Sequence, residues 1–233
     1  MLKRKLYSTG LLVYCSLIIT VSNIQESNTD VKKASYGDSL ASDEPVFILP
    51  DLDQNPTAFR FVKSYIEKNS WGLSRIKKRS TPSFAAISSA FAKYDIPEDL
   101  KYMAIVESNL NTTLVCSNTG ATGIWQLMPV TACELGLKIA DDCDERLHVY
   151  KSSVAVAKYL KQLYTQFGDW LLVVAAYNSG PAKVTRAIQS SGSSDFWQLQ
   201  NFLPVETRNH VKRYISVLYF FEMQNNIPPQ VSA

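Results

Sequence analysis

Residues 169–188, DWLLVVAAYNSGPAKVTRAI, place the strongest constraint on what this chain can fold into. The segment is apolar on every side through Ala176, which predicts a helix buried on all its faces. The preceding residues 150–170 have an amphipathic helical pattern that stops at Gly168. Because no alternating strand pattern and no internal repeat occurs, residues 80–223 are predicted to form an all-α domain. The predicted apolar face of the amphipathic helix consists of Val156, Leu160, Leu163 and Phe167.

The composition is that of an ordinary globular protein. With 46% hydrophobic and 19% charged residues, the 233-residue chain can form one well-cored domain and a shorter flanking segment. These values exclude a collagen-like chain, a coiled coil and a wholly disordered chain. The formal net charge is +3, and the Lys and Arg residues are spread along the chain. We therefore predict no nucleic-acid partner.

The first 22 residues have the layout of a secretory signal. Three cations among the first five residues precede an uncharged apolar run, from about residue 10 to residue 21, that is short for a membrane span. We predict a signal peptide over residues 1–22, with an uncleaved N-terminal anchor and membrane association as the alternative. Lipidation at Cys15 is less favoured, because the bulky Tyr14 precedes it. This layout implies export to the periplasm or the cell envelope.

The rest of the chain divides by its hydrophobic pattern. The stretch after the signal is polar without a hydrophobic period, and the helical spacing of Phe59, Val62 and Ile66 begins after it. A helix cap at Ser80 or Thr81 then opens the main domain. The predicted segments are a polar linker over 23–45, a helical N-terminal extension over 46–79, the main domain over 80–223 and a C-terminal tail over 224–233.

The cysteines and histidines show no metal-binding pattern. Cys133 and Cys143 lie ten residues apart and could close a small loop in an exported protein, leaving Cys116 over. The equal alternative to this disulfide is that the cysteines are reduced and buried. His148 and His210 have no Cys or His partner at ligand spacing. We therefore predict no metal and no cofactor.

One carboxylate, Glu107, stands at the end of an apolar stretch, DIPEDLKYMAIVES. Asp95, followed three residues later by Glu98, has the pattern of a capping box, which predicts the helix start. Glu107 then shares a face with the apolar residues Leu100 and Met103. Burial disfavours a charged carboxylate, so we expect Glu107 to have a raised pKa and to remain an acid near neutral pH.

Two further segments carry candidate binding residues. SNTGATGIWQLMP, residues 117–129, has two glycines that let the backbone approach a ligand, followed by Gln126 and Met128, which suit a sugar. A tight turn with a core Trp125 is the alternative. Tyr177 and Asn178 end the buried helix, where they either line a cleft or cap the turn.

In order along the chain, VESN, GATGIWQLMP, AAYNSGPAKV and LPVETRNHV resemble the sequence blocks of lytic transglycosylases with the soluble-lytic-transglycosylase (SLT) catalytic domain. The resemblance covers about residues 80–223. Within the family, the chain looks most similar to the membrane-bound murein transglycosylase D branch. It implies an all-α fold like that of goose-type lysozyme. It also implies cleavage of the β-1,4 bond between N-acetylmuramic acid and N-acetylglucosamine in peptidoglycan, leaving 1,6-anhydromuramoyl ends.

The resemblance also implies roles for particular residues. Glu107 would act first as acid and then as base, and Tyr177 would hydrogen-bond its carboxyl group. Ser117 would lie near the substrate's acetamido group, and Glu206 would form part of the cleft wall. The remaining residues expected to line the glycan cleft are Ser108, Gln126, Met128 and Asn178.

Several features leave alternatives open. His210 replaces a tyrosine that is usual at this place in the family, and we predict a surface or structural histidine rather than a second titrating group. No acid accompanies residues 120–129, and we predict that the acidic cluster over 141–145 is a solvated loop. Because glycosidases commonly use two carboxylates, a single acid favours the transglycosylase. A goose-type lysozyme that hydrolyses the same bond and a non-catalytic peptidoglycan-binding scaffold are the alternatives.

Overall fold

The structure, a computed structural model, describes Leu52 and residues 55–222. These residues belong to one compact unit. The predictions for the signal peptide or anchor over 1–22, for Cys15, for the linker over 23–45 and for the tail over 224–233 lie outside the described residues.

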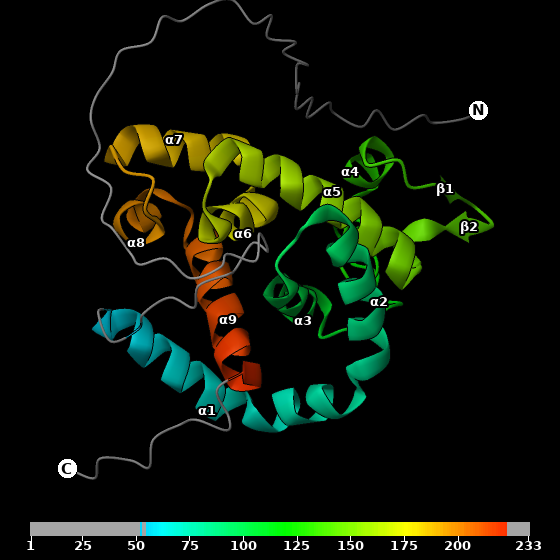
Figure 1. Cartoon of the computed structure of the whole chain (residues 1–233), viewed down its shortest axis with the longest axis horizontal. Helices are drawn as coiled ribbons and strands as arrows, with labels where there is room; N and C mark the ends of the chain where they lie inside the picture. Colours follow the sequence, from blue (N-terminus) through cyan, green and yellow to red (C-terminus); the bar gives the residue numbers. More distant parts are fainter. Residues whose placement is uncertain (1–51, 53–54, 223–233) are drawn as a thin grey trace, which may run out of the picture. The chain divides into compact units, whose positions relative to one another are not determined.

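The described part of the chain is mainly helical, as the sequence predicts (Figure 1). The exception is a hairpin of very short strands, β1 (Ile139–Ala140) and β2 (Cys143–Asp144), which pair antiparallel. The α-helices are α1 (Pro56–Arg79), α2 (Thr81–Phe91), α3 (Met103–Ser108), α4 (Pro129–Glu134), α5 (Val149–Phe167), α6 (Trp170–Ser179), α7 (Pro181–Ser191), α8 (Phe196–Leu199) and α9 (Val205–Glu222). Short 3-10 helices are η1 (Ala92–Tyr94), η2 (Glu98–Tyr102), η3 (Glu145–Leu147) and η4 (Gln200–Phe202).

Helix α6 lies within the core, packed against α5, α7 and α9 (Figure 1). Every residue from Trp170 to Ala176 is buried, which confirms the prediction of a helix with no exposed face. The side chain of Asp169 accepts a hydrogen bond from the backbone N–H of Leu172 and so caps the helix start. The preceding helix α5 ends at Gly168 in the left-handed conformation, as predicted. The core therefore holds the end of α6, with Tyr177 and Asn178, in a fixed place.

Helix α1 packs along α9, the last helix of the described chain (Figure 1). Its buried residues include Val62, Leu73 and Ile76, which belong to the same hydrophobic core as the later helices. Ile66 is partly buried against that core, but Phe59 is 47% exposed. The helical spacing is confirmed, but Phe59 does not share the buried face with Val62, since Ala58 takes the buried position beside it.

The chain between α2 and α3 differs from the sequence prediction at its start. Asp95 adopts a left-handed conformation, with φ 52°, and ends η1 instead of capping a new helix. Its carboxylate accepts a bond from Lys161 at 3.2 Å, while Glu98 bonds to Ser88 and Lys101. The predicted capping box is therefore absent between these two residues. Helical structure resumes as η2, after the extended Pro97.

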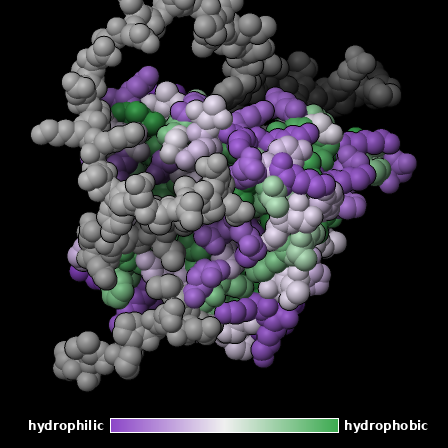
Figure 2. All heavy atoms as spheres, viewed as in Figure 1, coloured by the Kyte–Doolittle hydropathy of each residue, from purple (hydrophilic) through white to green (hydrophobic). Residues whose placement is uncertain are grey.

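Exposed apolar side chains are scattered over the described surface. On the face in Figure 2, hydrophilic and hydrophobic residues are intermixed. The most exposed large apolar side chain, Trp71, carries the guanidinium of Arg75 at 4.7 Å from its ring centroid. Among residues 55–222, no helix combines the length and the apolar character needed to cross a membrane.

Candidate active site

Glu107 lies in the last turn of α3, a short helix that packs against α9. The chain leaves this helix through two consecutive left-handed residues, Asn109 (φ 54°) and Leu110 (φ 57°). Leu110 is only 4% exposed, and its burial anchors this unfavourable turn. The side chain of Glu107 retains 16% exposure, so the carboxyl group is largely buried but can still be reached. This is the core-facing placement that the helical spacing predicts.

The glycine-containing loop over residues 114–128 is held to α3 beside Glu107. Ser108 is buried, and its hydroxyl lies 2.8 Å from the carbonyl oxygen of Ile124 and 3.1 Å from that of Ala104, to which it can donate. Gly123 has φ +79°, and a Cβ atom there would come within 2.2 Å of the carbonyl oxygen of Arg146. Ser108 therefore ties the loop to the helix of Glu107. Gly123 permits the backbone of the loop to approach the backbone of Arg146 closely.

Arg146 clamps the same loop from η3. Its Nη1 atom donates to the carbonyl oxygens of Gly120 at 2.7 Å and Leu127 at 3.0 Å. Its other nitrogens pair with the carboxylate of Asp144, with Nη2 at 2.6 Å from Oδ2. The prediction of a solvated acidic loop therefore holds for Asp141 and Asp142, which are exposed, but is wrong for Asp144, which supports a buried arginine.

Trp125 belongs to the core rather than to a sugar-binding surface. It is fully buried, its Nε1 donates to the hydroxyl of Ser153 at 2.9 Å, and its ring packs against Phe91. Its carbonyl oxygen accepts the hydroxyl proton of Tyr177 at 2.8 Å. The phenol proton of Tyr177 is therefore directed to Trp125, and not to the Glu107 carboxyl as the resemblance suggests. Burial raises the pKa of the Tyr177 phenol, and the charge of Glu107, within electrostatic range, raises it further.

Helix α9 brings a histidine into the site. His210 is 3% exposed, and its Nε2 lies 3.4 Å from Oε1 of Glu107. This nitrogen is buried and makes no hydrogen bond of ordinary geometry within the described residues. The expectation of a surface histidine is therefore wrong, because α9 packs directly against α3 and places His210 beside the acid. The alternative of a structural histidine stays a prediction.

Arg213 is a site residue that the sequence reasoning missed. It lies one turn beyond His210 on α9, and its positive charge acts on both His210 and Glu107. Its Nε atom is buried without a hydrogen-bond partner among the described residues. A sequence signal exists, since Glu206, His210 and Arg213 are spaced i, i+4 and i+7 and so share one helix face.

The electrostatics of the site keep both central groups uncharged near neutral pH. Burial raises the pKa of Glu107 to about 8, although the charge of Arg213 opposes the rise and that of Glu206 adds to it. Burial lowers the pKa of His210 to about 4, and Arg213 lowers it further. Between these values a protonated carboxyl group faces a neutral imidazole. Glu107 can therefore donate a proton at neutral pH.

The other predicted site residues lie at different depths. Gln126 has φ 49°, and its amide donates to the carbonyl oxygens of Gly123 and Leu114, so its nitrogen serves the loop itself. Met128 is 43% exposed at the end of that loop. Asn178 is half-buried at the exit of α6, while Ser117 and Glu206 are exposed. Among these residues, Glu206 acts on Glu107 through its charge, which adds to the rise of the Glu107 pKa that burial causes.

The cysteines of the described chain are unpaired. Cys116, Cys133 and Cys143 are free, which leaves the alternative of a disulfide unrealised, and Cys133 is exposed rather than buried. In the part of the chain that the structure describes, no three His, Cys, Asp or Glu side chains lie together as metal ligands would.

Together, the fold and the site define a class of helical domains built around one buried acid. Residues 85–200 match the sequence family described as the transglycosylase SLT domain, and this part of the chain belongs to that family.

Comparisons with known proteins agree with this assignment. The chain is 30% identical to the membrane-bound lytic murein transglycosylase D of Escherichia coli K12, over 92% of this chain and 52% of that protein. It thus spans about half the length of this relative.

Solved structures share the fold at lower sequence identity. The 70-kDa soluble lytic transglycosylase of Escherichia coli aligns with a TM-score of 0.53 and 21% identity, over 72% of this chain and 30% of that protein. An inactive mutant of the lytic transglycosylase Slt from Pseudomonas aeruginosa aligns with a TM-score of 0.52 and 23% identity, over 62% and 24% of the two chains. The all-α, lysozyme-like fold expected from the sequence is confirmed for the described residues.

Proposed function

We propose that this protein is a peptidoglycan lytic transglycosylase in which Glu107 is the catalytic residue. The observation that carries the proposal is a largely buried carboxyl group whose pKa is raised to about 8, at the end of a helix in an SLT domain. The similarity to the membrane-bound lytic murein transglycosylase D protein supports murein as the substrate. The resemblance of the sequence blocks implies the bond between N-acetylmuramic acid and N-acetylglucosamine as the one that is cleaved. The predicted signal over residues 1–22 supports action in the cell envelope.

The reaction needs one group that gives a proton and later takes one. Protonated Glu107 donates its proton to the glycosidic oxygen, and the bond from that oxygen to the anomeric carbon breaks. The resulting carboxylate then removes the proton from the C6 hydroxyl of the same muramic acid, whose oxygen bonds to the anomeric carbon. The product is a 1,6-anhydro ring, water is not consumed, and Glu107 is again protonated.

His210 has a positioning role in this scheme. As a neutral imidazole with its proton on Nε2, it donates toward Oε1 of Glu107, which leaves the acid proton on Oε2. The 3.4 Å separation is long for a hydrogen bond, and such bonds commonly shorten when the substrate binds. After the first proton transfer, the same N–H stabilises the carboxylate until the C6 hydroxyl is deprotonated. Arg213 supports this step, because its charge disfavours protonation of His210.

Hydrolysis of the same bond is the second candidate function, and the position of Glu206 favours it. Glu206 lies in the first turn of α9, close enough to Glu107 for its charge to affect the Glu107 pKa. A second carboxylate of this kind activates water in inverting glycosidases. The exposure of Glu206 favours a place in the cleft wall instead.

Mass spectrometry of digested peptidoglycan separates these functions. We expect 1,6-anhydromuramoyl ends, which are 18 mass units (about one water) lighter than reducing ends. A Glu206→Gln variant should form the same products. If the parent protein forms reducing ends and the Glu206→Gln variant does not, the protein is a hydrolase. If the parent protein does not cleave peptidoglycan, it is a glycan-binding scaffold.

The proposed roles predict a plateau of activity between about pH 4 and pH 8. Above pH 8 Glu107 loses its proton, so the acid is missing. Below pH 4 His210 becomes a cation, which stabilises the carboxylate formed in the first step and so weakens it as the base for the C6 hydroxyl. We expect kcat/KM to fall below pH 4 and above pH 8. The His210→Gln variant keeps an N–H group but cannot titrate, so it should lose the fall at acid pH and keep the fall at alkaline pH.

A matched variant separates positioning from packing. His210→Phe keeps the ring volume without a donor, and we expect its kcat to fall about 10- to 100-fold with little change in KM. His210→Gln should retain more of the kcat. Equal kcat values in both variants, or an acid limb that persists in His210→Gln, would show that His210 has only a packing role.

A further inference from the structure

Helix α1 carries a concentration of positive charge that the proposed active site does not use. Its 24 residues contain seven cations and one acid, Glu67. Seven positive charges less one negative charge give this helix a net charge of +6, whereas the whole chain has +3. The rest of the chain is therefore net negative, and the positive charge is gathered in α1. The cations are Arg60, Lys63, Lys68, Arg75, Lys77, Lys78 and Arg79.

Most of this charge lies on the side of α1 that faces away from the protein. The helix packs along α9, and its buried residues include Val62 and Leu73 (Figure 1). With about 3.6 residues per turn, the opposite side has Trp71 near its centre. We call this opposite side the outer face of α1. The exposed cations on the outer face are Arg60, Lys63, Lys68, Arg75 and Lys78.

The cations of the outer face are available to a partner. Within Leu52 and residues 55–222, none of these five cations forms an ion pair. Lys77 and Arg79, in contrast, donate to the carbonyl oxygens of Phe221 and Asn109 and so bond to the protein itself. The outer face is therefore a row of uncompensated positive charge.

An exposed tryptophan stands among these cations. Trp71 is 73% exposed, the largest value among the exposed large apolar side chains of the described residues. The guanidinium of Arg75 lies 4.7 Å from the centroid of its ring, and Lys68 precedes it by about one helical turn. Tryptophan beside basic side chains is typical of the boundary between a membrane and water, where the ring meets the apolar region and the cations meet the headgroups.

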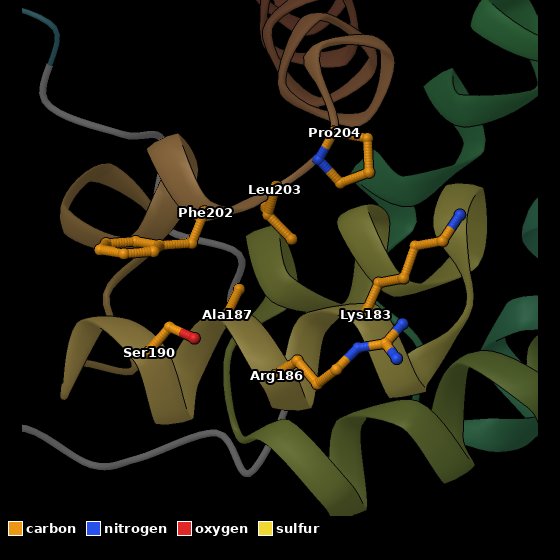
Figure 3. A pocket seen from close by; sticks show the side chains of 7 residues that line it. All are labelled: Lys183, Arg186, Ala187, Ser190, Phe202, Leu203 and Pro204. Atoms are coloured by element: carbon orange, nitrogen blue, oxygen red, sulfur yellow. The ribbon is translucent and has the colours of Figure 1, made fainter.

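The shape of the outer face suits a planar surface. Elsewhere, on α7, Lys183 and Arg186 line a recess of about 440 Å³ that has Leu203 across it (Figure 3). A recess of that kind can enclose a ligand. The outer face of α1 is instead the convex side of one helix, about 36 Å long. A convex row of cations encloses no ligand, but it can touch a negatively charged plane along its whole length.

We infer that the outer face of α1 binds the surface of a membrane that contains anionic phospholipids. The five cations contact the headgroup phosphates, and Trp71 enters the boundary between the headgroups and the acyl chains. The helix lies parallel to the surface and does not insert further, because its apolar side is already buried in the core of the protein. This inference does not depend on which bond the protein cleaves.

The test measures binding of the full chain to vesicles made of phosphatidylglycerol and phosphatidylcholine in equal parts. We expect the Lys68→Gln/Arg75→Gln variant to bind about tenfold more weakly than the parent protein, or weaker still, because both cations lie close to the anionic surface. The difference should shrink at high salt and be absent on vesicles of phosphatidylcholine alone. The matched control is Lys183→Gln/Arg186→Gln, which removes an exposed lysine and an exposed arginine from α7 and should bind as the parent does.

Quenching of Trp71 fluorescence gives a readout that holds even if another part of the chain also binds the vesicles. Brominated phosphatidylglycerol should quench the parent protein, and Trp71→Phe should lose that quenching, since Trp125 and Trp170 are buried. Quenching that is lost in Trp71→Phe supports the inference even where the affinities of the parent and the Lys68→Gln/Arg75→Gln variant are alike.

Two results would overturn the inference. The first is a parent protein whose Trp71 the brominated lipid does not quench. The second is an equal loss of vesicle binding in the α7 control, which would show that any exposed cations of the protein have the same effect. If Lys68→Gln/Arg75→Gln weakens sedimentation with purified peptidoglycan and Trp71 is not quenched by lipid, the outer face belongs to the wall polymer instead.

Discussion

Glu107→Gln is expected to lower kcat for peptidoglycan cleavage by a factor of about 1,000 or more. General acid and base catalysis typically contributes about 10²- to 10⁴-fold, and here one residue supplies both steps. Glutamine has nearly the shape of the protonated acid but cannot give a proton to the glycosidic oxygen. KM should change little, because the amide retains the size of the carboxyl group. The measurement is the rate of release of anhydromuropeptides from purified peptidoglycan.

The same substitution should stabilise the fold at alkaline pH. The folded pKa of Glu107 is about 8, above the ordinary value of 4.5, so the folded protein holds this proton more tightly than the unfolded chain does. The stability that the proton contributes is complete below about pH 4.5 and is lost as the pH rises to 8. Glu107→Gln removes this loss, and we expect it to be about 2–4 kcal/mol more stable than the parent at pH 8. At pH 4 the two should be equal.

This pair of readouts distinguishes a catalytic acid from a structural one. A stable but inactive Glu107→Gln protein supports the assignment. Glu67→Gln is the matched control, since it makes the same chemical change at an exposed carboxylate of α1. Undiminished activity in Glu107→Gln would refute the role of Glu107, and a variant less stable than the parent at pH 8 would contradict the raised pKa.

The sequence predicts best what depends on local pattern. Seven consecutive apolar residues can only be buried on all sides, and α6 is buried from Trp170 to Ala176. Gly168 ends α5 because glycine readily adopts the left-handed conformation found there. The placement of Glu107 also follows from local spacing, even though the predicted capping box at Asp95 is absent.

The predicted capping box does not form because each of its two residues bonds to a residue outside the predicted helix start. Asp95 bonds to Lys161 of α5, and Glu98 bonds back to Ser88 of α2. Pro97 also restricts the residue before it to extended conformations, which separates Asp95 from the helix that follows. A capping pattern states only which bonds are available, and tertiary contacts decided between them here.

His210 and Arg213 could not be assigned from the sequence for a different reason. The spacing of α9 places them on one face, but spacing does not tell which helix that face meets. The packing of α9 against α3 decides it and brings Nε2 of His210 to 3.4 Å from Glu107. In the same way, the proton of Tyr177 goes to Trp125 because a folded loop, and not a local pattern, presents that carbonyl oxygen.

Arg146→Met is expected to destabilise the protein by about 3 kcal/mol or more and to reduce its activity. The side chain of Arg146 is only 7% exposed, and its partner Asp144 is 20% exposed. Removing one partner of such a buried pair typically costs about 3–5 kcal/mol, because the remaining charge stays without compensation. The substitution also removes the donors to Gly120 and Leu127 that hold the loop beside Glu107. Chemical denaturation and kcat measure the two effects.

Lys151→Met is the matched control for this prediction. Lys151 also pairs with an acid of the same region, Glu145 at 2.7 Å, but its side chain is 51% exposed, so we expect little loss of stability. A double variant, Asp144→Leu with Arg146→Met, should recover part of the stability, since no charge is then left buried, but not the kcat, because the loop still lacks its clamp. Recovery of both would show that Arg146 serves only to compensate Asp144. Full activity and stability in Arg146→Met would show that the loop holds its shape without it.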